Sequence, residues 1–137
     1  MYLQRTNGTF KRGKNMKYKF EINERLPGLN EYTRACRTNK YVGAKLKKET
    51  EEYIYYYILE QLRDVKINNK VFIKFTWIEE NGKRDYDNIC FAKKFILDAL
   101  VKAKVLKDDN KSHVSGFMDK FEYAEKSKVI VEMEEIE

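Results

Sequence analysis

The chain of 137 residues is 42% hydrophobic and 14% aromatic, enough for one packed domain and too little for two. Lys and Arg number 28 against 22 Asp and Glu, and the net charge of +6 favours a polyanionic partner. Neither a secreted disulfide pattern nor an apolar run of about 18 residues occurs, so we expect a cytoplasmic protein with no membrane partner.

Positive charge is concentrated toward the amino terminus. Residues 1–48 hold 13 Lys or Arg and 3 Glu, whereas the rest of the chain holds 15 basic and 19 acidic residues. Residues 4–15 combine glycines, asparagines and basic side chains, a composition typical of a mobile segment. We therefore expect a flexible basic arm over residues 1–15 and a single domain over residues 16–137.

Hydrophobic periodicity predicts the first regular elements. Tyr18, Phe20 and Ile22 alternate with charged residues, which indicates a half-buried strand over residues 17–22. Residues 41–62 contain no proline and repeat apolar side chains every four positions, which predicts a long helix. Its tyrosines exceed what one buried stripe requires, so some are candidates for contact with bases or with a second subunit. Residues 71–78 are apolar on both faces, as expected of a central strand.

A loop rich in hydrogen-bond donors is expected between the first strand and the long helix. Residues 26–30, with the sequence LPGLN, are typical of a turn. Side chains suited to phosphate oxygens lie in and after it, namely Asn30, Arg34, Arg37 and Lys40. A merely solvated loop would have a similar composition, and both interpretations stay open at this point.

An acidic motif, Arg84-Asp85-Tyr86-Asp87-Asn88, follows the central strand. In an extended backbone Asp85 and Asp87 point to the same side, with Tyr86 directed toward the core. Two carboxylates held in this way can share one divalent cation. Capping of the next helix, expected over residues 88–100, is the structural alternative for Asp87, and it leaves Asp85 unexplained.

The lysines of that helix differ in direction. Lys94 follows Asp87 by seven positions and returns to nearly the same azimuth, whereas Lys93 does not, so Lys94 is expected to face the carboxylates. Asp98 shares the azimuth but lies roughly 16 Å along the helix, too far to share a metal with Asp87. The chain after the helix can span about 30 Å, which allows Asp109 to return to Asp85 within one chain or across a dimer.

The last elements read as strands over residues 113–118 and 126–133, with a turn region over residues 119–123. The resulting order β-α-β-α-β-β predicts an α/β (α+β) fold with a mixed sheet covered mainly by helices.

Three motifs together resemble the RusA family of Holliday junction resolvases, especially its phage and Gram-positive members. They are the acidic motif at 84–88, the sequence LDAL at 97–100, and Asp108-Asp109, supported by LPGLN at 26–30 and VSGF at 114–117. The resemblance covers roughly residues 17–135. It implies a homodimeric, Mg²⁺-dependent endonuclease that nicks two strands of a four-way DNA junction symmetrically.

The resemblance also implies roles for individual residues. Asp85, Asp87 and Asp109 correspond to the acidic, metal-binding site, and Arg84 to a basic residue before the first aspartate, which is expected to contact DNA. Lys94 is chosen as the catalytic lysine, and Lys93 is assigned to DNA contact. The enteric pattern instead has a lysine four positions after the second aspartate, where this chain has Phe91, so which lysine acts is left open.

The chemistry that follows is hydrolysis of a phosphodiester at a metal-bound acidic site. Oxygen ligands without a thiol or imidazole cluster favour Mg²⁺, with Mn²⁺ as substitute, over zinc. A two-fold homodimer would supply two sites at one spacing. Two alternatives remain: a non-catalytic nucleic-acid-binding module whose aspartates only cap a helix, and a Mg²⁺-dependent nuclease acting on flap or other branched DNA.

Overall fold

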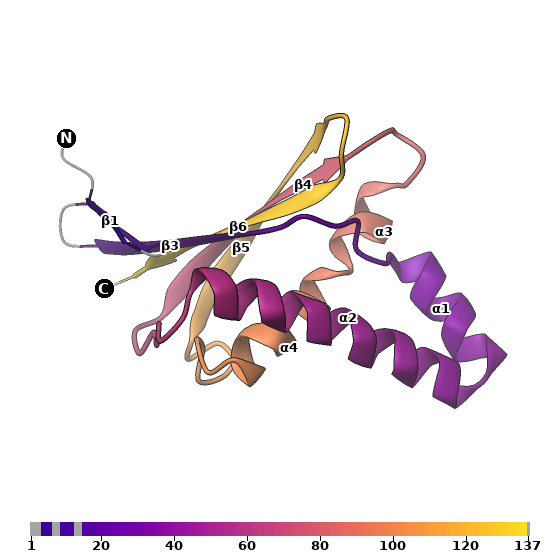
Figure 1. The fold of residues 1–137 in the computed structure, drawn as a ribbon, viewed down its shortest axis with the longest axis horizontal. Coiled ribbons are helices and arrows are strands. Elements are labelled where there is room, and N and C mark those ends of the chain that lie inside the picture. The colour runs from indigo at the N-terminus through magenta and orange to yellow at the C-terminus, as the bar shows by residue number, and fades with distance from the viewer. Residues whose placement is uncertain (1–3, 7–8, 13–14, 137) are drawn as a thin grey trace.

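The computed structural model describes residues 4–6, 9–12 and 15–136, which form one mixed sheet and a set of helices (Figure 1). The elements in chain order are β1 Gln4–Thr6, β2 Thr9–Arg12, β3 Asn15–Ile22, α1 Leu29–Thr38, α2 Lys40–Gln61, β4 Val71–Glu79, α3 Tyr86–Cys90, α4 Lys93–Lys102, β5 Val114–Tyr123 and β6 Lys128–Glu135. The strand order is β1-β2-β3-β6-β4-β5, and among the described strands β4 and β5 are the only neighbours that pair in parallel. The predicted α+β class with a mixed sheet is confirmed.

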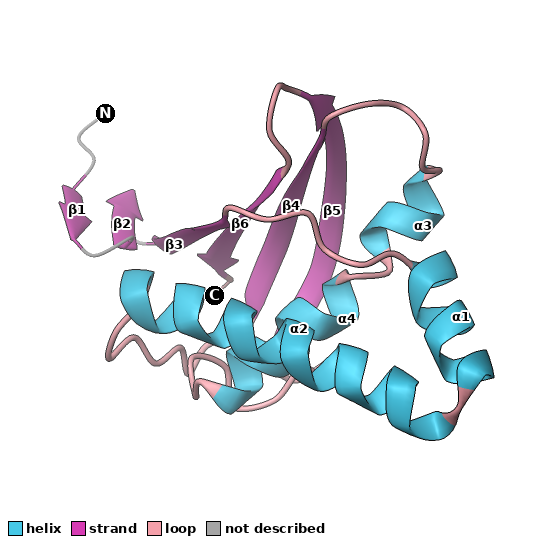
Figure 2. Ribbon diagram, turned by 45° about the vertical axis from the view of Figure 1, so that its right-hand side comes forward, coloured by secondary structure: helices cyan, strands magenta, loops and turns pink. Residues whose placement is uncertain are grey.

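The helices cover one face of this sheet, as Figures 1 and 2 show for α2 and α4. Strand alternation explains the choice of face, because Phe20, Phe75 and Val131 are aligned across β3, β4 and β6 and are fully buried. Ile54 of α2 and Phe95 of α4 belong to the same core. The opposite face is lined by alternate, mostly charged side chains and carries no described helix, so the predicted helical cover holds on one side only.

Several predicted elements are confirmed. The long helix over 41–62 is α2, the strands over 17–22 and 71–78 are β3 and β4, and the strand over 126–133 is β6. As predicted, β4 is central, since it pairs with both β5 and β6.

Other predicted boundaries are wrong. The expected donor-rich loop is mostly helix α1, which sequence periodicity missed because none of its residues is fully buried. The turn predicted over 119–123 is the second half of β5. Of the expected flexible arm, residues 4–6 and 9–12 are strands β1 and β2, while residues 1–3, 7–8 and 13–14 lie outside the described residues.

The helix predicted over 88–100 is interrupted. Helix α3 ends at Cys90 and α4 begins at Lys93. The turn between them is tightened by hydrogen bonds of the 3₁₀ type, which join residues three apart: the Ala92 N–H donates to the Ile89 carbonyl, and the Phe95 N–H to the Ala92 carbonyl. The two lysines after this turn therefore do not keep the azimuths of one continuous helix.

Candidate acidic site

The two aspartates of the acidic motif lie where the chain leaves the sheet and enters α3. Asp85 is the N-cap residue of α3, with φ −69° and ψ 157°, and its side chain makes no capping hydrogen bond. Asp87, the predicted N-cap, lies instead in the first turn of the helix, two residues after the actual N-cap. Both residues are exposed, and within the described structure neither carboxylate has a hydrogen bond or an ion pair. Tyr86 points outward and is 57% exposed, stacked on Phe121, rather than toward the core as predicted.

Arg84 fixes the approach to this pair. Its Nε and Nη2 atoms donate to the two carboxylate oxygens of Glu79, both at 2.8 Å, and Nη1 donates to the Leu26 carbonyl at 3.0 Å. The Arg84 and Glu79 side chains are each only 11% exposed. Because its donors are used inside the chain, we assign Arg84 to positioning the acidic motif in place of the predicted DNA contact.

The LPGLN turn and the acidic motif, 58 residues apart, lock together. The Asn30 N–H donates to Asn88 Oδ1 at 2.9 Å, alongside the bond from Arg84 to the Leu26 carbonyl. Gly28 allows this close approach, since a Cβ there would lie 2.5 Å from Asn88 Oδ1. The structure thus brings together two motifs that carried the family resemblance, and it leaves the Asn30 side chain exposed.

The two lysines have different partners. Lys94 Nζ lies 3.2 Å from Asp98 Oδ1 and 3.9 Å from Asp109 Oδ2, and the hydrogen bond to Asp98 raises the pKa of Lys94. Lys93 Nζ lies 2.8 Å from Asp119 Oδ2 and 4.7 Å from the centre of the Phe117 ring. Lys94 therefore meets one of the predicted acids, Asp109. Lys93 is 19% exposed and held in an internal ion pair, which differs from its predicted contact with DNA.

Asp119 is the residue that sequence reasoning missed. It lies on the helix-covered face of β5, where it accepts a hydrogen bond from Trp77 Nε1 at 2.9 Å as well as pairing with Lys93. Burial raises the pKa of the nearby Cys90 thiol, and the carboxylates of Asp119 and Asp87 add to that shift. The alternation of Phe117, Asp119 and Phe121 was the available signal, since a carboxylate between inward-facing aromatics requires a partner.

The three predicted aspartates are not gathered into one ligand set. Across the described residues, no group of three or more His, Cys, Asp or Glu side chains is arranged to hold a metal ion. Asp85 and Asp87 share the start of α3, whereas Asp109 lies beside Lys94. In donor chemistry the exposed Asp85–Asp87 pair fits a hard divalent cation, which takes carboxylate oxygens and water.

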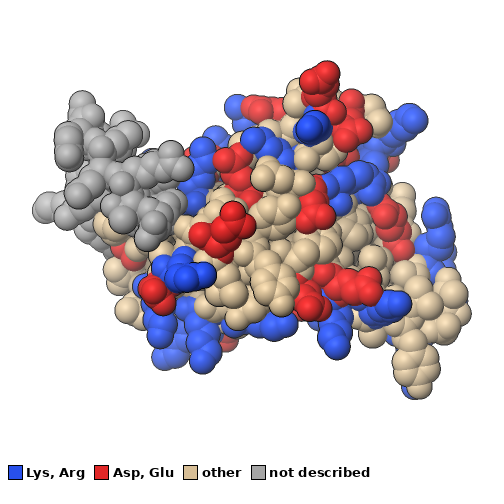
Figure 3. Space-filling model, viewed as in Figure 1, with Lys and Arg blue, Asp and Glu red and all other residues tan. Residues whose placement is uncertain are grey.

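The remaining predicted DNA contacts form a separate surface. Arg34 and Arg37 are exposed on α1, and Lys40 is exposed at the start of α2. In Figure 3, blue and tan side chains project at the right-hand end of the molecule, where Figure 1 places the junction of α1 and α2.

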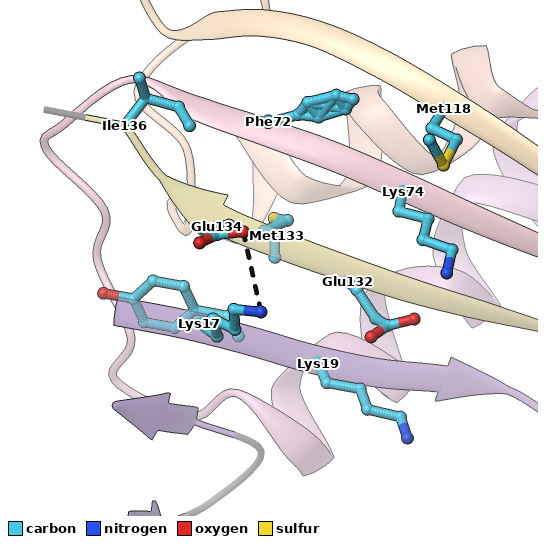
Figure 4. A pocket seen from close by; sticks show the side chains of 10 residues that line it. Lys17, Lys19, Phe72, Lys74, Met118, Glu132, Met133, Glu134 and Ile136 are labelled. Carbon is cyan, nitrogen blue, oxygen red and sulfur yellow. Dashed lines mark ion pairs between the residues drawn. The ribbon is translucent and has the colours of Figure 1, made fainter. Parts of the chain in front are cut away.

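A hollow of about 670 Å³ lies on the uncovered face of the sheet (Figure 4). Its lining mixes charged and apolar side chains: Lys17 pairs with Glu134 at 3.8 Å, and Phe72 and Met118 also line the hollow. None of the predicted site residues contributes to it.

No protein-family model matches the chain, and the search of curated proteins gave no match either. Among the helices of the described residues, none is both long and apolar enough to cross a membrane.

Proposed function

We propose that this protein is a Mg²⁺-dependent endonuclease that acts on branched DNA, as a Holliday junction resolvase does. The observation that carries the proposal is the exposed, unpartnered Asp85–Asp87 pair, in a motif held in place by contacts with the distant LPGLN turn. Unpaired neighbouring carboxylates on a basic protein repel each other, and a divalent cation relieves that repulsion. The resemblance to the RusA family, drawn from the same motifs, points to the same chemistry.

In this proposal Asp85 and Asp87 hold the cation, whereas Asp109 lies 3.9 Å from Lys94 and does not join them in a ligand set within the described chain. The bound ion would polarise a phosphate oxygen and lower the pKa of a bound water. Arg84, fixed by Glu79, sets the position of the pair. Lys94 is cationic at neutral pH, as an ordinary lysine is, and the hydrogen bond to Asp98 raises its pKa further; it offsets negative charge near Asp109.

Paired incision requires two such sites, and a two-fold homodimer supplies them at one spacing. Helix α2 offers a contact surface for this dimer. Tyr53 and Tyr57 pack against the core, while Tyr56 is 60% exposed. Sedimentation at micromolar concentration, with and without junction DNA, is expected to give a dimer, and a protein that stays monomeric in both would contradict this part of the proposal.

The proposal is tested by comparing labelled four-way, flap, single-stranded and linear DNA in Mg²⁺ and in EDTA. Nicks in the four-way junction at symmetric positions, present in Mg²⁺ and absent in EDTA, are expected. Faster cutting of flaps than of junctions would support the nuclease activity but indicate that its substrate is another kind of branched DNA.

The second candidate is a nucleic-acid-binding module without catalysis. It is favoured by the lack of a third acidic side chain beside Asp85 and Asp87 in the described part of the chain. Tight binding of branched DNA with no metal-dependent nicking of any substrate would select this candidate.

A further inference from the structure

The corner between α1 and α2 presents an aromatic ring to solvent. Tyr41, in the first turn of α2, is 73% exposed, more than any other large hydrophobic side chain of the described residues, and Val42 beside it is 40% exposed. The ring is far too exposed to contribute much to the core, so its packing does not explain its position. Lys40 Nζ lies 5.4 Å from its centre, at cation–π distance.

The backbone under this ring is tightly held. A single residue, Asn39, separates α1 from α2, and its Oδ1 accepts hydrogen bonds from the N–H groups of Tyr41 at 2.9 Å and Val42 at 3.0 Å. The two helices approach closely, since a Cβ on Gly43 would lie 2.5 Å from Cys36 Sγ. A ring presented on a rigid corner loses little conformational freedom when it stacks on a ligand.

The surroundings of the ring are cationic. No acidic residue occurs between Glu31 and Glu49, whereas that segment contains Arg34, Arg37, Lys40, Lys45, Lys47 and Lys48. Lys45 and Lys47 pair with acids of α2 and α4. The other four cations are exposed and have no ion pair among the described residues. Such charges attract a phosphate backbone.

From this combination we infer that the α1–α2 corner, residues 34–48, binds single-stranded or unpaired segments of DNA, with Tyr41 stacking on a base. Aromatic rings flanked by cations are the common means of binding single strands, because every base offers a face for stacking. In an intact duplex the bases are already stacked on one another, so the corner favours strands with unpaired bases. The inference concerns binding alone and holds whether or not the protein cuts DNA.

The test is fluorescence anisotropy with a labelled oligothymidine strand, in EDTA so that cutting plays no part. Tyr41→Ala is expected to weaken binding about tenfold, which is within the range for loss of one stacking contact. Tyr41→Phe, which keeps the ring, should bind as the wild type does. Tyr123→Ala is the matched control, because Tyr123 is 61% exposed at the far end of β5.

Salt dependence separates stacking from charge. Tyr41→Ala should leave the slope of log affinity against log salt unchanged, whereas Arg37→Gln should reduce it by about 0.7. Unchanged melting temperatures would show that the variants fold. Binding by Tyr41→Ala within twofold of the wild type, or an equal loss in Tyr41→Phe or Tyr123→Ala, would overturn the inference.

Discussion

Replacing Arg84 by alanine tests whether this guanidinium holds the acidic motif in place. The substitution removes two hydrogen bonds to Glu79 and one to the Leu26 carbonyl, and it leaves the Glu79 carboxylate, in a residue only 8% exposed, without its cation. Breaking a buried ion pair from one side costs about 3–5 kcal/mol. For a chain of this size, that loss corresponds to a fall of roughly 10–17 °C in melting temperature.

Urea unfolding of four proteins measures this effect: the wild type, Arg84→Ala, Glu79→Gln and the double variant. Since the neutral amide needs no cation, the double variant should be much less destabilised than the sum of the two single variants. A loss below about 1 kcal/mol in Arg84→Ala, the value of an ordinary surface ion pair, or strictly additive losses, would refute the positioning role. The same variant should also cut DNA poorly under conditions where it remains folded.

Three further predictions concern packing and charge. Gly43→Ala should destabilise the protein by about 1–3 kcal/mol in urea unfolding, because the new Cβ would lie 2.5 Å from Cys36 Sγ; Cys36→Ala should recover most of that loss, and no recovery would contradict the explanation. Burial raises the pKa of Glu51, against the opposing effect of Lys47, so the folded state loses stability as the pH rises from the ordinary Glu pKa through the raised one. Glu51→Gln should therefore be more stable than the wild type at pH 7 and equally stable below the ordinary carboxyl range, and thermal melts that show no such convergence would count against it. In a Cys36→Ala background, Asp119→Asn should move the pH profile of Cys90 alkylation to lower pH, since the Asp119 carboxylate raises the pKa of that thiol. An unchanged profile would show that the Asp119 charge does not affect the Cys90 pKa.

Strong periodicity made the main elements predictable from sequence. β4 is dense in β-branched and aromatic residues, and α2 repeats its apolar residues over many turns, so local pattern and tertiary burial agree. α1 lacks a buried residue, and it is held by contacts with α2 and α3 that no local pattern reveals. With no buried apolar stripe to indicate a helix, its basic and polar composition was interpreted as a loop.

The candidate site was predictable in composition and less so in geometry. The Asp85–Asp87 pair was recognisable, because two carboxylates in a basic chain require an explanation. The partner of Arg84 was not, because Glu79 lies just beyond the strand predicted over residues 71–78, and only the structure shows that it is buried at the end of β4. The directions of the two lysines were not predictable either, because the tight turn at residues 91–92 interrupts the helix and changes the azimuth of every side chain after it.

The central claim is that Asp85 and Asp87 form the metal-dependent cutting site. Its most direct test measures nicking of a labelled four-way junction in Mg²⁺ by the wild type, Asp87→Asn and the control Glu80→Gln, which neutralises an exposed acid in the same connection. We expect Asp87→Asn to lose cutting while binding the junction normally, and Glu80→Gln to cut as the wild type does. Full nicking by Asp87→Asn would contradict the claim.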